Sequence, residues 1–307
     1  MKQDKFMGAD CVVLENDDVR AVILPAHGGK AVSLVLKENG FECLFQNPKP
    51  AFSRARRGDN FSDFEACGFD DAFPTVDACE VSVGGRTVVY PDHGEIWSAA
   101  FETVREGDAL KLRYESDSLG YVYEKTWSVE GHSLVCTYRI HNPGSSDIPA
   151  IWTCHCLMRA EAGMHLIVPE GADSVENVFS NDWLGEAGRI LAYPLADGPR
   201  GAVDLSKMPS DGQLKYYFVS PVKDGCCGYR YEASGVEVTL HYDAKRLPYL
   251  GFWATGGAYR GDRNCALEPS DGYFDGISLA TSKGRCPVLH AGETREFKLE
   301  LRVDRFR

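Results

Sequence analysis

Three side chains of this sequence could carry out acid–base chemistry: Glu268, His155 and His93. A carboxylate with a reference pKa of about 4.3 accepts a proton, and an imidazole with a pKa of about 6.5 can donate one at neutral pH. Glu268 stands directly before Pro269. Proline cannot donate to a sheet ladder, and it biases the residue before it towards extended geometry. We therefore expect Glu268 to be the last residue of a strand, held at the rim of a sheet.

The strands around Glu268 predict where its side chain points. Strand alternation places Asn264, Ala266 and Glu268 on one face, so that Glu268 faces either a cleft or open water. An ordinary carboxylate at the rim is the alternative. In the preceding strand, Trp253 and Tyr249 share a face. Because sugars present C–H faces that stack on aromatic rings and hydroxyls that need polar partners, Trp253 is a candidate substrate contact.

The two histidines lie in different settings. His155 belongs to the β-forming run PAIWTCHCLMRAE, in which it shares a face with Thr153 and Leu157. His93 lies in the segment PDHG at a strand end, and loops are where catalytic groups tend to be placed. Each could instead be an ordinary packed or turn histidine. Together with Glu268, the two imidazoles could run general acid–base chemistry.

Short runs of β-forming residues fill the chain and predict the elements that hold these groups. Residues 12–24 read as a hairpin, and residues 78–158 read as a series of short antiparallel strands with Gly-, Asp- and Asn-rich turns. A short helix is plausible at 181–189. Since no repeat or linker interrupts the pattern, we expect one all-β domain over residues 1–307. Its length favours two large antiparallel sheets packed face to face as a β-sandwich.

The stretch from Pro48 to Pro74 is a long excursion without a clean period. It contains five phenylalanines, which argues for an ordered segment at the rim of the fold. Its arginines, among them Arg54 and Arg57, either contact an anionic group of a substrate or belong to a solvated loop. Arg57 is therefore a candidate substrate contact. Asp71, in the same excursion, is a second candidate.

Composition excludes several classes of partner. The chain has 307 residues, of which 44% are hydrophobic, and its net charge is −12. This charge argues against nucleic acids and anionic membranes, because both require a basic surface. The N-terminus lacks the apolar region of a secretory signal, and no run approaches the roughly 18 apolar residues of a membrane span. We expect a cytoplasmic protein, as a monomer or a homodimer, whose ligand is a small molecule.

Cysteine spacing and motif searches narrow the chemistry further. The 11 cysteines are odd in number, so at least one is unpaired in a monomer, and buried reduced thiols are the simplest interpretation. No CxxC occurs, which disfavours a zinc site, and no metal is expected. The chain also lacks GxSxG, GxxxxGK[ST], HExxH and GxGxxG. It therefore shows no motif of a serine hydrolase, a phosphate loop, a zinc peptidase or a dinucleotide-binding enzyme.

Taken together, these segments resemble the aldose 1-epimerase (galactose mutarotase-like) superfamily. The resemblance runs from PAHGGKAVSLVLKENGFECLF, through the His-Gly of PDHGEIW and the His of WTCHCLM, to LGFWATGG and NCALEPSDGYFDG. The last segment is the most specific. The resemblance implies a β-supersandwich with an open cleft, and sugar ring opening without a cofactor. It also implies that Glu268 is the general base, protonated His155 the general acid and His93 a second histidine that binds the substrate.

The sequence departs from the galactose-type pattern at Lys215, near the place where an acidic substrate-binding residue is expected. An exchanged charge there would contact a different hydroxyl pattern or an anionic sugar. The leading hypothesis is an isomerase that acts on an unidentified sugar. The alternatives are a non-catalytic sugar-binding or sugar-sensing protein, and a lyase or hydrolase on a related sandwich. Asp271 and Asp275 are the carboxylates nearest to Glu268, and both are assigned to the following turn.

Overall fold

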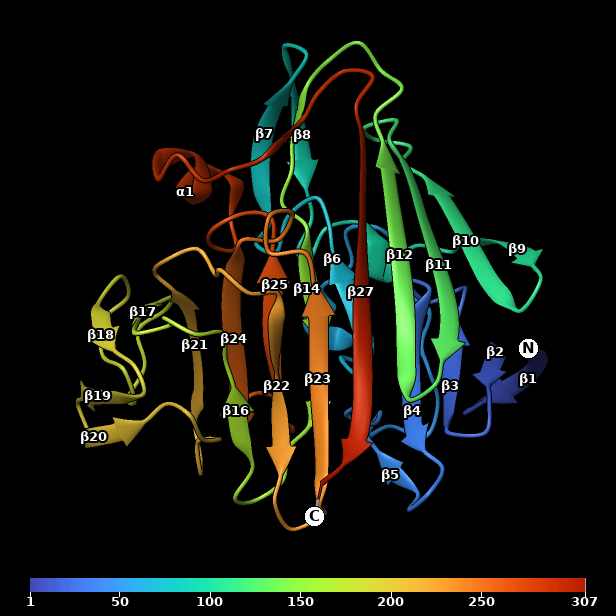
Figure 1. Ribbon diagram of the computed structural model, residues 1–307. Helices are drawn as coiled ribbons and strands as arrows, with labels where there is room; N and C mark the ends of the chain where they lie inside the picture. The colour runs from blue at the N-terminus through green and yellow to red at the C-terminus, as the bar shows by residue number, and fades with distance from the viewer. Residues whose placement is uncertain (307) are drawn as a thin grey trace.

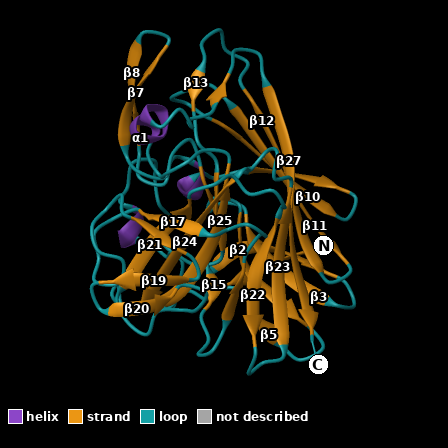
Figure 2. Ribbon diagram, turned by 60° about the vertical axis from the view of Figure 1, so that its left-hand side comes forward, coloured by secondary structure: helices purple, strands orange, loops and turns teal. Residues whose placement is uncertain are grey.

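The computed structural model describes residues 1–306 and consists mainly of antiparallel β-strands (Figure 1). Two large sheets, of 13 and 8 strands, form two layers, which Figure 2 views from a second direction. The predicted all-β architecture of two large antiparallel sheets is therefore confirmed. The hairpin expected over residues 12–24 is also present.

The 13-stranded sheet carries the candidate functional residues near its middle. Its strands, in spatial order, are β1 (Lys2–Phe6), β2 (Ala9–Glu15), β3 (Val19–Leu24), β4 (Lys30–Leu36), β6 (Phe69–Ala72), β14 (Thr153–Cys156), β25 (Arg263–Ser270), β24 (Tyr249–Gly256), β21 (Gln213–Phe218), β17 (Ser174–Asn177) and β18 (Ile190–Ala192). Two short strands lie off this path, β5 (Phe41–Glu42) beside β4 and β15 (Met158–Arg159) beside β25.

The 8-stranded sheet covers one face of the larger sheet. Its strands, in spatial order, are β16 (His165–Ile167), β22 (Cys226–Tyr231), β23 (Val236–Tyr242), β27 (Thr294–Arg305), β12 (Ser133–His141), β11 (Val122–Glu130), β10 (Ala109–Glu115) and β9 (Glu102–Glu106). Side chains alternate along these strands, so in β11 Tyr123, Lys125 and Trp127 are buried between the sheets.

Smaller elements complete the described chain. Three two-stranded sheets pair β7 (Cys79–Val83) with β8 (Arg86–Tyr90), β13 (Ile148–Pro149) with β26 (Val288–Leu289), and β19 (Leu195–Gly198) with β20 (Gly201–Asp204). The helical pieces are η1 (Phe61–Asp63), η2 (Ile96–Ser98) and α1 (Ile277–Ser282). No helix within residues 1–306 is long and apolar enough to cross a membrane.

The prediction of a helix at 181–189 is wrong. The Asn181 side chain accepts hydrogen bonds from the backbone N–H groups of Trp183 and Leu184, at 2.9 and 2.8 Å. Such local side-chain bonds offer the backbone an alternative to helical bonding. The segment accordingly forms turns closed by a bridge between Asn181 and Gly185.

A network of polar groups between the two sheets overturns the prediction that Asp71 contacts substrate. Asp71 is 1% exposed, and its carboxylate lies 2.7 Å from Lys125 Nζ and 2.9 Å from the Tyr138 hydroxyl, which donates to it. Its neighbour Asp70 pairs instead with Lys30 on the opposite face. Because alternate residues of β6 point to opposite faces, the Asp71 side chain lies in the space between the sheets.

Lys125 and Asp71 form a buried ion pair that neither sheet could hold alone. Lys125 is fully buried, and burial raises the pKa of Asp71 although Lys125 acts in the opposite direction. Tyr123 donates to the same carboxylate at 3.2 Å. The pair therefore joins β6 of one sheet to β11 of the other. All 11 cysteines are free, and eight of them are buried.

Candidate functional site

A cavity of about 310 Å³ opens on the face of the 13-stranded sheet that is turned away from the 8-stranded sheet. His155 is adjacent in sequence to Cys154, which pairs in register with Asp71, so alternation directs His155 to this outer face. The residues that line the cavity are Phe61, Ala66, Val76, Asp77, His93, His155, Leu157, Val178, Phe179, Lys215, Trp253, Tyr259, Asn264, Glu268 and Asp275. The structure thus brings five residues named from the sequence to one cavity: Glu268, His155, His93, Trp253 and Lys215.

Glu268 faces the cavity from inside a strand and does not end it. β25 continues through Pro269 to Ser270, and Glu268 is 1% exposed, so the expectation of a residue at the rim is wrong. β14 and β25 pair at a single position, Thr153 with Ser270, so few backbone hydrogen bonds join these two strands beside Glu268. On its other side β25 is paired with β24 along its whole length, and this ladder holds Glu268 on the cavity face.

Gly251 makes room for the Glu268 carboxylate. It pairs in register with Glu268 on one side and with Tyr217 on the other. A Cβ atom at Gly251 would come within 3.1 Å of both Glu268 Oε2 and the Tyr217 ring. The absence of a side chain at this position therefore allows the carboxylate and the Tyr217 ring to occupy the same face.

Lys215 lies between two carboxylates of the cavity wall. Its Nζ is 3.0 Å from Glu268 Oε2 and 2.9 Å from Asp275 Oδ1, and all three residues are buried. Asp275 Oδ1 also accepts a hydrogen bond of 2.8 Å from the Tyr217 hydroxyl. The distance from Lys215 Nζ to Glu268 Oε2 is that of an ion pair, but the contact does not have the angle of a hydrogen bond. Glu268 Oε2 therefore has no hydrogen-bond donor among the described residues.

The charges of this cluster shift its proton affinities. Burial raises the pKa of Glu268, Lys215 lowers it, and Asp275 raises it again, with a net upward shift. Burial opposes the charge of Lys215, but Asp275 and Glu268 outweigh burial and raise the Lys215 pKa well above its usual range. Lys215 is therefore a firmly charged ammonium group whose charge is shared between two neighbouring carboxylates.

His155 is more deeply buried than His93. It is 7% exposed, and its ring lies edge-on to Phe61 and His93, at centroid distances of 5.4 and 5.1 Å. Burial, followed by the nearby charges of His93 and Lys215, lowers the pKa of His155 well below its ordinary value. Burial therefore favours the neutral imidazole over the imidazolium form that the resemblance implied.

His93 is fixed by its backbone and by its neighbours. Its φ is +56°, and the following Gly94 also has a positive φ, which turns the chain back so that the imidazole reaches the cavity. The ring stacks on Phe61 at 3.8 Å, and Nδ1 lies 2.9 Å from a carboxylate oxygen of Asp92. With Nδ1 occupied in this way, Nε2 is the ring nitrogen left for another partner.

Aromatic side chains form the other walls of the cavity. Trp253 donates to Asn264 Oδ1 at 3.3 Å, and the Tyr259 ring lies edge-on to it at 5.7 Å. Phe179 is 6.3 Å from the same indole, and Phe61 faces the two histidines. Rings that are held on several sides of a small cavity offer stacking surfaces for the C–H face of a sugar.

Arg57 does not line the cavity, so the structure does not support it as a substrate contact. Its Nε donates to the buried carboxylate of Glu95 at 2.7 Å, and Nη2 donates to the Val89 carbonyl at 2.8 Å. The guanidinium thus fastens the 48–74 excursion to the β8 region. Sequence alone could not reveal this role, because Glu95 is 38 positions away.

We expect Arg57→Ala to leave ligand affinity unchanged and to lower the free energy of unfolding by about 1 kcal/mol. The loss is small because Ser116, Ser118 and Tyr121 still donate to Glu95. Urea unfolding and calorimetric titration with sugar would measure the two quantities. A marked loss of affinity without loss of stability would return Arg57 to the binding site.

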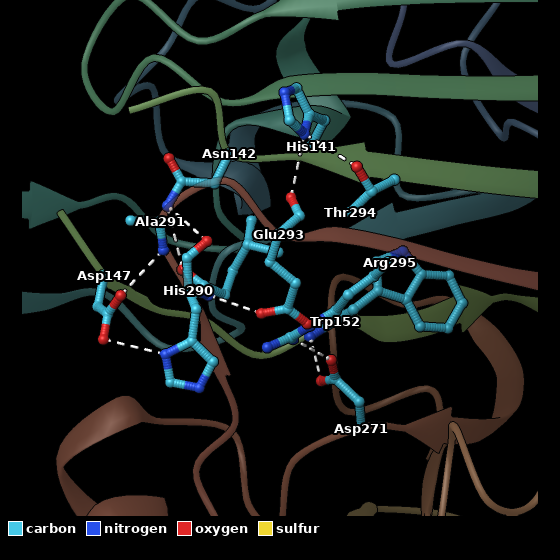
Figure 3. A network of polar contacts seen from close by, with 11 residues as sticks. His141, Asn142, Asp147, Trp152, Asp271, His290, Ala291, Glu293, Thr294 and Arg295 are labelled. Carbon is cyan, nitrogen blue, oxygen red and sulfur yellow. Dashed lines mark hydrogen bonds and ion pairs between the residues drawn. The ribbon is translucent and has the colours of Figure 1, made fainter. Parts of the chain in front are cut away.

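A separate polar network follows the end of β25, and none of its labelled residues lines the cavity (Figure 3). Asp271 accepts a hydrogen bond from the backbone N–H of Trp152 at 2.7 Å and pairs with Arg295 at 3.0 Å. Arg295 also contacts Glu293. Burial, opposed by Arg295, raises the pKa of Asp271 to about 6. Asp271 therefore has a structural role, whereas Asp275, assigned to the same turn, lines the cavity.

Asp77, Asp275, Phe179 and Tyr259 are lining residues that the sequence did not single out. Asp275 had a local signal, since it stands seven positions after Glu268 in the segment that is most specific for the resemblance. The others come from loops that approach the cavity only in the folded chain. Among the described residues, no group of three or more His, Cys, Asp and Glu residues could hold a metal ion.

No protein-family model and no curated protein sequence matches this chain. Solved structures do match it in fold. A protein of Synechocystis sp. PCC 6803 superposes with a TM-score of 0.75 at 17% identity, over 99% of this chain and 100% of that one. A candidate aldose 1-epimerase from Escherichia coli K12 gives 0.72 at 16% identity, over 96% and 99%. A galactose mutarotase-like protein from Lactobacillus casei ATCC 334 gives 0.70 at 17% identity, over 96% and 100%. The chain therefore has the galactose mutarotase-like fold that its sequence predicted.

Proposed function

We propose that this protein interconverts the anomers of a sugar by general acid–base ring opening, in the manner of an aldose 1-epimerase. The observation that carries the proposal is the joint position of Glu268 and His155. They come from different strands, each is more than 90% buried, and both line one cavity. A protein that only binds sugar does not need a buried carboxylate and a buried imidazole in the same cavity.

The size of the cavity suits a single sugar ring. Its volume of about 310 Å³ lies at the small end of the range for ligand sites, which runs from roughly 300 to 1,000 Å³. Trp253 and Tyr259 provide aromatic surface, and Asn264 provides an amide. Such a mixture of rings and polar groups matches a pyranose, which has apolar C–H faces and hydroxyls at its edge.

Ring opening in the proposed reaction needs two proton transfers, and ring closure needs the same two in reverse. The Glu268 carboxylate removes the proton of the anomeric hydroxyl, while an imidazolium form of His155 gives a proton to the ring oxygen. The bond between the anomeric carbon and the ring oxygen breaks, the C1–C2 bond rotates, and the ring closes on the other face with the two roles reversed. Positioned acid–base groups of this kind contribute about 10²–10⁴-fold each.

The burial of both groups favours the sharing of one proton between Glu268 and His155. Burial disfavours the charged form of both groups, so it raises the pKa of the carboxyl and lowers that of the imidazole. The difference between the pKa of Glu268 and the pKa of His155 becomes smaller. The proton then costs less free energy to place on either group, which suits a reaction that runs in both directions through reversed roles.

Trp253→Ala tests the aromatic wall. We expect KM for the exchanged sugar to rise about fivefold, because a stacking contact is worth roughly 1 kcal/mol, with a smaller change in kcat. Two-dimensional exchange NMR over a range of sugar concentrations would separate KM from kcat. Trp183→Ala, which removes an indole outside this cavity, is the matched control. An unchanged KM would show that the substrate does not lie on the Trp253 ring.

The proposal as a whole is tested by anomer exchange with a panel of monosaccharides, measured by NMR against the spontaneous rate. Acceleration by the wild-type protein, and not by a heat-inactivated sample, supports an isomerase. Binding by calorimetry without acceleration of any sugar would instead favour the sugar-sensing alternative.

A further inference from the structure

The charges that line the cavity are unequal. The lining residues supply three carboxylates, from Asp77, Glu268 and Asp275, against one ammonium, from Lys215. Lys215 was the residue that suggested an anionic sugar. Its Nζ lies 3.0 Å from Glu268 and 2.9 Å from Asp275, so its charge is already matched by two carboxylates inside the protein. A phosphate or carboxylate on a ligand would have to compete with both.

Asp77 is the carboxylate without such a partner. Its backbone N–H donates to the Asp275 carbonyl at 2.9 Å, which fixes the segment, but its side chain forms no ion pair or hydrogen bond within residues 1–306. Asp77 is exposed to solvent at the cavity wall, although partial burial and the neighbouring Asp275 carboxylate raise its pKa. A cationic group of a bound molecule would find this carboxylate unoccupied.

Two further features of the walls point to a ligand with a positive charge. His155 is 7% exposed, lines the cavity and has no hydrogen-bond partner among the described residues, so its ring nitrogens are free to bind a ligand. Phe61, Phe179, Trp253 and Tyr259 surround the same space. The face of an aromatic ring attracts an ammonium group and gives no such attraction to an anion.

We propose that the sugar taken by this cavity carries a protonated amine, which lies against Asp77, and that phosphorylated and carboxylated sugars are excluded. This inference rests on the proposed sugar site and names the class of sugar. Lys215 acts as an internal counter-ion of Glu268 and Asp275, and not as a receptor for an anionic group. Hydroxyls also bind carboxylates, so a neutral hexose would bind more weakly but would still enter.

The test compares sugars that differ in charge. Glucosamine, galactosamine and mannosamine are set against their parent hexoses, their N-acetyl derivatives, glucose 6-phosphate and glucuronic acid. Calorimetry gives Kd, and exchange NMR gives the anomerisation rate. We expect at least one amino sugar to bind about tenfold more tightly than its parent hexose and its uncharged N-acetyl derivative, and both anionic sugars to bind more weakly than glucose.

Asp77→Asn makes the test specific for this side chain. The ratio of amino-sugar affinity to parent-hexose affinity should fall close to one, whereas Asp197→Asn, the same change at an exposed carboxylate outside the cavity, should keep the wild-type ratio. Equal affinities for amino sugar, hexose and N-acetyl sugar in the wild-type protein, or tighter binding of glucose 6-phosphate, would overturn the inference. The proposed function fails separately, when sugars bind but no anomer exchange exceeds the spontaneous rate.

Discussion

Replacement of Glu268 by glutamine is expected to lower the rate of anomer exchange by about 10³-fold while the protein stays folded. Glutamine has nearly the shape of glutamate but cannot accept the proton of the anomeric hydroxyl. The side chain is 1% exposed and faces Gly251, so a larger residue would not fit in its place. Lys215 keeps Asp275 as its partner in this variant, which limits the loss of stability.

The control for Glu268→Gln is the same change at Glu176. That carboxylate is also buried and paired with a lysine, Lys283, but it does not line the cavity. Glu176→Gln should exchange anomers at the wild-type rate. Exchange NMR measures the rates, and circular dichroism with thermal unfolding confirms that both variants are folded. Wild-type exchange by Glu268→Gln would remove this carboxylate from the mechanism.

Lys215→Met is expected to move the pH dependence of the reaction and to slow it by roughly 10- to 100-fold at pH 7. The ammonium of Lys215 lowers the pKa of Glu268, whereas burial and Asp275 raise it. Removal of the ammonium therefore raises the Glu268 pKa further. The base must be deprotonated to act, so the pH at which activity appears shifts upward, and activity at neutral pH falls.

A pH profile of kcat/KM distinguishes this effect from a loss of folding. Because Lys215 also lowers the pKa of His155, the descending limb of the Lys215→Met profile should shift to higher pH together with the ascending limb. Lys283→Met, which removes an ammonium 2.7 Å from Glu176 outside the cavity, should not shift either limb. An unshifted ascending limb in Lys215→Met would mean that the ammonium does not set the charge of the catalytic carboxylate.

The fold could be predicted because the sequence pattern that produces it is local and recurs along the chain. Alternating β-forming runs bounded by turn residues describe most strands, and they place Asn264 and Glu268 on the cavity face. The elements that were missed are short. α1 has six residues, which is too few for a helical period to appear, and β6 has four residues inside an irregular excursion.

The site could be predicted only in part, because some of its properties depend on packing. Residue types and the family resemblance suggested Glu268 and His155, but not the loss of charge that burial imposes on His155. Asp71 was predicted to contact substrate because no strand period was recognised in β6, and the face on which it lies was therefore not considered. The pairing of Lys215 with two carboxylates depends on β21, β25 and the following turn, which meet only in three dimensions.

The ion pair between Asp71 and Lys125 also has a consequence for how such sequences diverge. Loss of one member leaves an unpaired charge between the sheets at a cost of about 3–5 kcal/mol, and an apolar arrangement would also have to replace the hydroxyls of Tyr123 and Tyr138 that donate to Asp71. The two positions should therefore mutate in concert across descendants of this gene. Substitution of one residue without the other would be selected against. The ionic arrangement can therefore be replaced by an apolar one only when these positions change together.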